Sequence, residues 1–231
     1  MWEAEAVECL AEPAGAEAEL AWLDEALAGR GRAVLWHGAQ GLVAPLSYRR
    51  HAGFDAACAE FARDGWPVRL RRSGGGVVPQ GAGILNLSLA APVAGPPGDV
   101  APRLYADLCV RLAAALEELG IDARPGAVEG SFCDGRFNLA VAGRKIAGTA
   151  QYWRRGAGAR QAVLAHALLL VDADVQALAA RASAFEAALG SERRYRADAL
   201  TTVVREARAA PADPMQDLRR RLDAALRERR S

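Results

Sequence analysis

Helix-like and strand-like segments alternate along this chain, and one clear hairpin interrupts them. Apolar residues recur at helical spacing in residues 17–28, 54–64, 105–119, 175–189 and 214–229. Strand-like runs lie between them, at residues 33–36, 68–70, 84–90, 163–171 and 200–204. The dipeptide Ala142-Gly143 separates two further runs, 137–141 and 144–152, and favours a β-hairpin. Because antiparallel hairpins and interleaved helices occur together, we predict an α/β (α+β) fold with a mixed β-sheet flanked by helices.

Finer expectations follow from the same segments. Residues 84–90 alternate apolar and polar side chains, which predicts a half-buried strand. Residues 91–102 are rich in proline and glycine and are expected to connect this strand to the next helix.

Length and charge narrow the class of protein. A chain of 231 residues with 52% hydrophobic residues can bury a sizeable core, and we expect a single domain over residues 1–231. A net charge of +1 disfavours binding to nucleic acid or to a membrane surface through bulk charge. The longest apolar run, 162–171, contains His166 and is too short to span a bilayer. The first residues lack the pattern of a secretory signal, so we expect a cytoplasmic protein.

The chain uses arginine for nearly all of its basic residues. Of the 29 lysines and arginines, all but Lys145 are arginines. Burial readily lowers the pKa of a lysine but not that of an arginine. The single lysine, Lys145, therefore has either a specific role or no role beyond chance.

Four cysteines are present, and one of them stands apart. None has zinc-ligand spacing, so no metal site is expected, and disulfides are not expected in a reducing compartment. Cys58 and Cys109 lie at helical spacing and are expected in the core. Cys133 lies in a glycine-punctuated loop beside arginine, where cysteines are more often reactive. Cys133 and Lys145 are therefore a candidate catalytic pair, with a buried thiol and a surface lysine as the alternative.

The hairpin register limits this pair. Pairing around Ala142-Gly143 sets Lys145 opposite Ala140, so residues 130–135 must fold back for Cys133 to approach the lysine.

The second candidate site is a glycine cluster. Gly74, Gly75 and Gly76 follow Arg71, Arg72 and Ser73. Bare backbone N–H groups beside arginines suit a carboxylate, a phosphate or an acyl carbonyl, although a flexible turn is the alternative. The cluster lacks both the Walker order and the GxGxxG order. The histidines form no Ser-His-Asp set, and His166 is expected in the core or behind a site.

Together these motifs resemble the lipoate–protein ligase A / octanoyltransferase family. The segments that carry the resemblance are residues 71–76, 83–88, 134–139, 143–151 and 164–174. The likeness covers roughly residues 20–180 and implies the mixed α/β catalytic domain shared with biotin–protein ligases. It implies a substrate-binding set of Arg71, Arg72, Ser73, Gly74, Gly75, Gly76, Asn86, Asn138, Gly148 and His166. Lys145 would contact the acyl carbonyl, and the acceptor would be a lysine of a lipoyl domain or of glycine-cleavage H protein.

Within the family, residues 131–135 are similar to the Ser-Phe/Tyr-Cys-x-Gly segment of cysteine-dependent octanoyl transferases and amidotransferases. This similarity implies that Cys133 accepts an octanoyl or lipoyl group as a thioester from an acyl carrier or an acylated H protein, without a cofactor. A ligase that uses ATP and Mg²⁺ is the alternative, but only about 50 residues follow the last motif, so no full C-terminal accessory domain is expected. The third possibility is a non-catalytic acyl-binding relative. It is suggested by Ala167-Leu168, which replaces Gly-Thr after His166, while Pro79-Gln80 stands where many members have a histidine.

Overall fold

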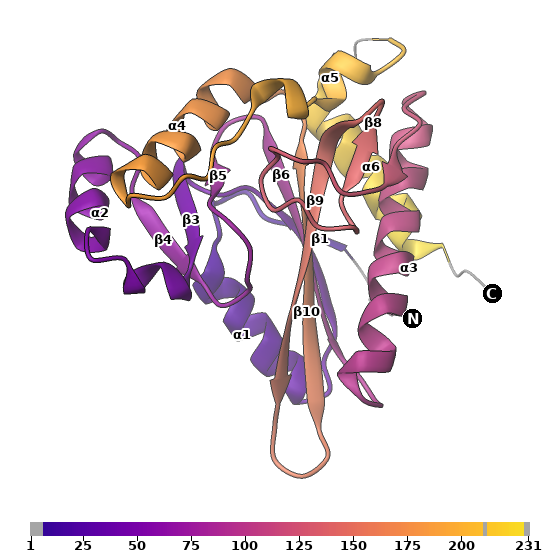
Figure 1. Cartoon of the computed structure of the whole chain (residues 1–231). Helices are drawn as coiled ribbons and strands as arrows, with labels where there is room; N and C mark the ends of the chain where they lie inside the picture. The colour runs from indigo at the N-terminus through magenta and orange to yellow at the C-terminus, as the bar shows by residue number, and fades with distance from the viewer. Residues whose placement is uncertain (1–6, 210–211, 229–231) are drawn as a thin grey trace.

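A mixed sheet forms the centre of the molecule. The computed structural model describes residues 7–209 and 212–228, and within them the larger sheet has seven strands in the order β1-β2-β6-β10-β9-β8-β7 (Figure 1). The strands are β1 (Val7–Cys9), β2 (Arg32–Trp36), β6 (Ile84–Pro92), β7 (Arg124–Pro125), β8 (Leu139–Val141), β9 (Arg144–Arg155) and β10 (Gln161–Leu170). β1 and β2 are parallel, whereas the other neighbours pair antiparallel. The predicted mixed sheet is confirmed.

Helices cover both faces of this sheet. α3 (Pro97–Glu117) and α6 (Pro214–Arg227) pack on one face, on the right in Figure 1, over the leucines of β6. α1 (Ala16–Leu27) packs on part of the opposite face, where Trp22, Leu23 and Ala26 meet β2, β6 and β10. In the described ranges no helix is long and apolar enough to cross a membrane.

A smaller sheet faces the uncovered part of the larger one. In the described part of the chain it has three strands in the order β4-β3-β5, namely β3 (Gly41–Pro45), β4 (Val68–Arg71) and β5 (Val78–Gln80). The short helix η1 (Leu46–Arg50), α2 (Phe54–Arg63) and α4 (Val175–Ala188) pack around it, on the left in Figure 1. The rings of Phe61 and Phe185 meet edge to face at 5.1 Å and join α2 to α4. β4 and β5 lead into and out of the glycine cluster, so this sheet fixes where the glycines lie.

Three expectations about elements were wrong. α3 begins at Pro97, inside the predicted connection, because proline suits the first turn of a helix. Residues 200–204 are not a strand: the Thr202 side chain accepts from the Arg205 N–H and begins the short helix α5 (Val203–Glu206). β6 is buried on both faces rather than half-buried, because Asn86 and Ser88 face the smaller sheet and α1.

Candidate active site

A cavity of 1190 Å³ separates the two sheets. Its wall on the larger sheet includes Asn86, Gly148 and Leu168, which lie side by side on β6, β9 and β10. Its wall on the smaller sheet includes Val43 and Leu70. The mostly apolar lining suits an aliphatic chain, and the glycine cluster and the loop that holds Cys133 border the same space.

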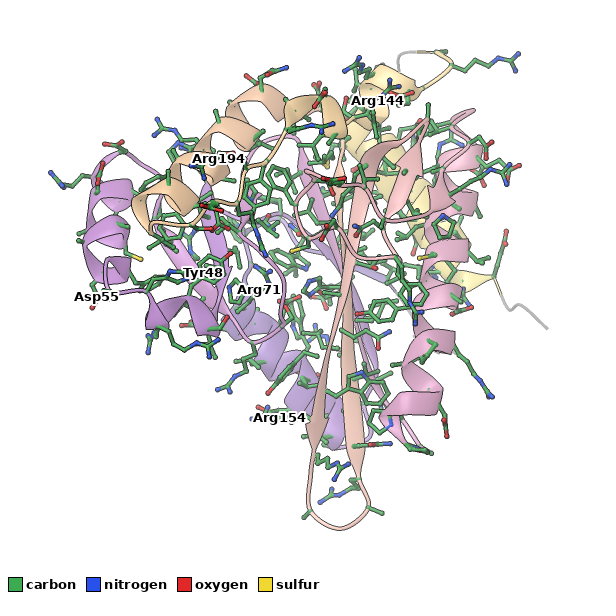
Figure 2. All side chains as sticks on the ribbon, viewed as in Figure 1. Tyr48, Asp55, Arg71, Arg144, Arg154 and Arg194 are labelled. Atoms are coloured by element: carbon green, nitrogen blue, oxygen red, sulfur yellow. The ribbon has the colours of Figure 1, made fainter. Side chains whose placement is uncertain are left out.

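Arg71 organises the glycine cluster. Its side chain is buried in the centre of the molecule, between the smaller sheet and the β9–β10 hairpin (Figure 2). Nη1 donates to the Val43 carbonyl at 2.7 Å, and Nη2 donates to the Gly74 and Gly76 carbonyls at 3.0 and 2.7 Å. Arg71 therefore shapes the loop by binding its backbone, and the same Nη2 lies 3.5 Å from the Cys133 sulfur.

The Cys133 sulfur rests on the backbone of the glycine cluster. The Gly76 N–H donates to Sγ at 3.2 Å, and the Gly76 carbonyl lies 3.6 Å away. Gly75 has a φ of 104°, and a Cβ at this position would lie 2.5 Å from the sulfur. The close approach of sulfur and backbone therefore requires glycine. The sulfur therefore lies beside two donors, a backbone N–H and a guanidinium.

Cys133 itself has a strained backbone, with a φ of 50°. Three donors hold its carbonyl oxygen: the Gly135 N–H at 2.8 Å, Asn138 Nδ2 at 2.7 Å and Lys145 Nζ at 3.2 Å. These contacts offset the strain and aim the side chain at the cavity.

Lys145 is buried beneath the cysteine loop. Its Nζ donates to the carbonyls of Phe132 and Cys133. The pKa of Lys145 is lowered to about 8, mainly by burial and in smaller part by Arg71, while the Cys133 and Asp134 charges oppose this change. A Cβ at Gly148 would lie 2.8 Å from Nζ, so glycine at this position leaves room for the ammonium group.

The predicted pair is therefore assembled as the hairpin register required. Lys145 lies opposite Ala140, and the loop before β8 folds back over the lysine. Lys145 is not a surface residue, and Cys133 is a half-buried thiol that lines the cavity. The ammonium group contacts the backbone of the cysteine loop rather than the sulfur.

Most of the predicted substrate-binding residues line the cavity. Those that do so are Arg71, Ser73, Gly74, Gly75, Asn86, Gly148 and His166. The others lie elsewhere: Arg72 is exposed beside a smaller adjoining cavity, Gly76 holds the sulfur from behind, and Asn138 is buried under the cysteine loop. The Ser73 hydroxyl is buried and has no hydrogen-bond partner among residues 7–209 and 212–228, which leaves it free to contact a bound group.

His166 belongs to a buried polar cluster that sequence reasoning did not find. Its Nδ1 lies 3.3 Å from Glu19 Oε1, which also accepts from Ser88 Oγ at 2.7 Å. Burial raises the pKa of the Glu19 carboxyl, but His166, Ser88 and Arg71 outweigh burial and lower the pKa overall. The Gln80 and Asn86 amides also pair reciprocally across the cavity wall, at 3.0 and 2.9 Å. The amphipathic spacing of α1 gave no signal that Glu19 is turned inward.

Among the residues that the structure describes, no three His, Cys, Asp or Glu side chains gather into a metal-ligand group. The cations at the site are instead arginine and lysine, which suit an acyl carbonyl or a carboxylate.

The sequence model of one protein family, described as the lipoyl protein ligase A/B catalytic domain, matches residues 51–220. The chain belongs to this family. A relative from Cupriavidus necator, described as an uncharacterized protein, is 52% identical over 219 residues, which are 90% of this chain and 84% of the relative. An octanoyl-[GcvH]:protein N-octanoyltransferase of Kyrpidia tusciae is 41% identical over 145 residues. That match covers 61% of this chain and 50% of the transferase, so the chain spans about half of that relative's length.

Solved structures show the same fold. A lipoate-protein ligase A bound with ATP superposes with a TM-score of 0.69 at 18% identity and covers 95% of this chain and 83% of its own. A lipoate protein ligase from Thermoplasma acidophilum superposes with a TM-score of 0.64 at 20% identity, covering 97% of this chain and 84% of its own. At such identities the likeness establishes the lipoate-protein ligase fold, as the sequence motifs predicted.

Proposed function

We propose that this protein is an acyltransferase that moves an octanoyl or lipoyl group onto a lysine of a lipoyl domain or of an H protein, through a thioester on Cys133. The position of the Cys133 sulfur on the Gly76 N–H, at the wall of a chain-sized cavity, carries the proposal. The likeness to an octanoyl-[GcvH]:protein N-octanoyltransferase supports the substrate class.

Acyl transfer to the cysteine forms one carbon–sulfur bond. The Cys133 thiolate attacks the acyl carbonyl of the donor, and the bond from that carbon to the donor's sulfur or nitrogen breaks. The proton that the thiol released ends on the departing group. In the second step the neutral amine of the acceptor lysine attacks the thioester carbon, the carbon–sulfur bond breaks and an amide forms, while the proton lost by the nitrogen passes to the departing sulfur or to solvent.

The surrounding groups stabilise the charge that develops in both steps. The Gly76 N–H and the Arg71 guanidinium lie beside the sulfur and can stabilise the negative charge that it carries as nucleophile and as leaving group. The unpartnered Ser73 hydroxyl lines the same space and can donate to the acyl oxygen. Lys145 adds a positive charge beneath the loop and fixes its backbone.

The cavity can hold the acyl chain across the strands. From Gly148 on β9 the wall continues through Leu168 on β10 to Asn86 on β6. These two strand spacings cover about 10 Å. A chain that lies along this wall ends at the Gln80–Asn86 pair.

Transfer without ATP tests this proposal. Octanoylated H protein and an unmodified lipoyl domain are incubated with the protein, and the lipoyl domain is followed by intact mass. We expect an octanoyl adduct on the lipoyl domain without nucleotide, and no adduct with Cys133→Ala. Transfer that requires ATP and releases pyrophosphate would indicate a ligase instead. Tight binding of the acyl group without transfer would indicate a non-catalytic relative.

A further inference from the structure

Tyr195 lies between the two loops that form the site, although it follows α4 and does not line the cavity. Its hydroxyl accepts from the Val77 N–H at 2.9 Å. Val77 directly follows Gly76, whose own N–H contacts the Cys133 sulfur. Two consecutive backbone amides therefore have different partners: one holds the nucleophile and the other is held by Tyr195.

The same tyrosine contacts the cysteine loop. Its ring packs against Phe132, the residue before Cys133, with 5.2 Å between ring centroids. The N–H of the next residue, Arg196, donates to the Gly130 carbonyl at 2.8 Å. One residue and its neighbour therefore bind both the glycine loop and the cysteine loop.

A buried carboxylate fixes the tyrosine. Glu186 on α4 is 1% exposed, and its Oε1 accepts from Tyr195 Oη at 2.9 Å and from Tyr48 Oη at 2.6 Å. Burial and the Glu186 charge raise the pKa of Tyr195 and raise that of Tyr48 to about 12, so both phenols stay protonated and donate. Because its proton is committed to Glu186, the Tyr195 oxygen is available as the acceptor for Val77.

The glycine loop accommodates this contact at Gly76. A Cβ there would lie 2.4 Å from Tyr195 Oη and 2.4 Å from Arg193 Nη1. Any side chain at residue 76 would therefore push the loop away from the tyrosine, and with it the N–H that contacts the sulfur.

We infer that Tyr195 is a positioning residue that holds the glycine loop and the cysteine loop in register, so that the Gly76 N–H meets the Cys133 sulfur. This inference rests on the proposed function in one respect: the proposed function gives the contact between the Gly76 N–H and the Cys133 sulfur its role in acyl transfer. The hydroxyl acts through the peptide of residues 76 and 77 and does not touch the substrate.

Tyr195→Phe tests the inference, because it keeps the ring against Phe132 and removes the hydroxyl. Tyr48→Phe is the matched control, since it removes the other hydroxyl on Glu186 and does not touch the glycine loop. The first readout is alkylation of Cys133 by iodoacetamide as a function of pH, in the absence of substrate. We expect Tyr195→Phe to move the profile to higher pH and to slow alkylation at neutral pH about fivefold, the effect of losing one hydrogen bond. Tyr48→Phe is expected to leave the alkylation rate close to that of the unmodified protein, because its hydroxyl contacts Glu186 and not the glycine loop.

Two further readouts separate positioning from general destabilisation. Amide hydrogen exchange is expected to accelerate in residues 74–78 and 130–134 for Tyr195→Phe only. In the transfer assay kcat is expected to fall about fivefold, while KM for the acceptor stays constant. If Tyr195→Phe does not fold, Glu186→Gln is used in its place and is expected to move the alkylation profile in the same direction.

Equal alkylation profiles and equal exchange for Tyr195→Phe and Tyr48→Phe would overturn the inference. This outcome is distinct from failure of the proposed function, because alkylation and exchange are measured on the resting protein. If Cys133 never carries an acyl group but its alkylation still depends on Tyr195, the coupling of the loops stands and the thioester route fails.

Discussion

Cys133, in the loop before β8, and Cys109, in the middle of α3, are two thiols with different surroundings. Cys109 is 1% exposed within the core, and burial raises the pKa of its thiol to about 11. Its sulfur has a carbonyl partner, that of Phe137 at 3.3 Å, which stabilises a protonated thiol. Cys133 also has a carbonyl nearby, that of Gly76 at 3.6 Å, but in addition an N–H and a guanidinium lie beside its sulfur, and it lines a cavity. The polarity of the neighbours therefore decides which thiol can act as a nucleophile.

Secondary structure explains the contrast. Within a helix the backbone N–H groups are already bonded, so none of them is available to the Cys109 sulfur, which contacts the Phe137 carbonyl. The glycine cluster is an irregular loop and leaves the Gly76 N–H free to meet a sulfur from another segment. The sulfur reaches this N–H because donors that include Lys145 hold the strained cysteine loop in place.

Among variants of the cysteine loop and its supports, the largest loss of acyl transfer is expected from Lys145→Met. Without the ammonium group the Phe132 and Cys133 carbonyls lose a donor and the site loses a positive charge. We expect acyl transfer to fall about 100-fold, the scale observed for removal of one charge-stabilising donor. Arg144→Met is the matched control, because this neighbouring cation pairs with Glu206 and not with the cysteine loop. Similar losses for both variants would contradict the role of Lys145.

The pH dependence of transfer is expected to follow Lys145. Its pKa of about 8 lies below the usual value for lysine, so the ammonium group loses its proton as the pH rises through 8. Turnover is therefore expected to decline above pH 8, and Lys145→Met is expected to lack this decline. The folded state binds fewer protons at Lys145 than the unfolded state between about pH 8 and the normal lysine pKa, so this group adds stability as the pH rises through that range. If turnover of Lys145→Met declines with the same midpoint as that of the unmodified protein, a group other than Lys145 causes the decline.

The smallest effects concern stability and have opposite signs at the two cysteines. Cys133→Gly is expected to stabilise the fold by about 1 kcal/mol, because glycine relieves the positive φ at this position. Cys109→Ala is expected to destabilise it by about 1 kcal/mol, because it leaves a small cavity in the core. Urea unfolding measures both changes. Destabilisation by Cys133→Gly would contradict the view that this loop is strained.

Local signals sufficed for much of the fold. Ala142-Gly143 placed the hairpin turn, and with it Lys145 opposite Ala140, because a turn fixes the register of its strands. Cys133 was identified from its loop. The contacts that complete the site could not be predicted, because they join segments distant in the chain. The Tyr195 hydroxyl meets an amide 118 residues away, and Ser88 meets Glu19 across 69 residues.

The most direct measurement is the mass of the peptide that contains Cys133 after incubation with an octanoyl donor and no acceptor. The expected result is one octanoyl group on Cys133, removed by hydroxylamine, with Cys9, Cys58 and Cys109 unmodified. An octanoyl group on another residue, or transfer to the lipoyl domain by Cys133→Ala at the wild-type rate, would contradict it.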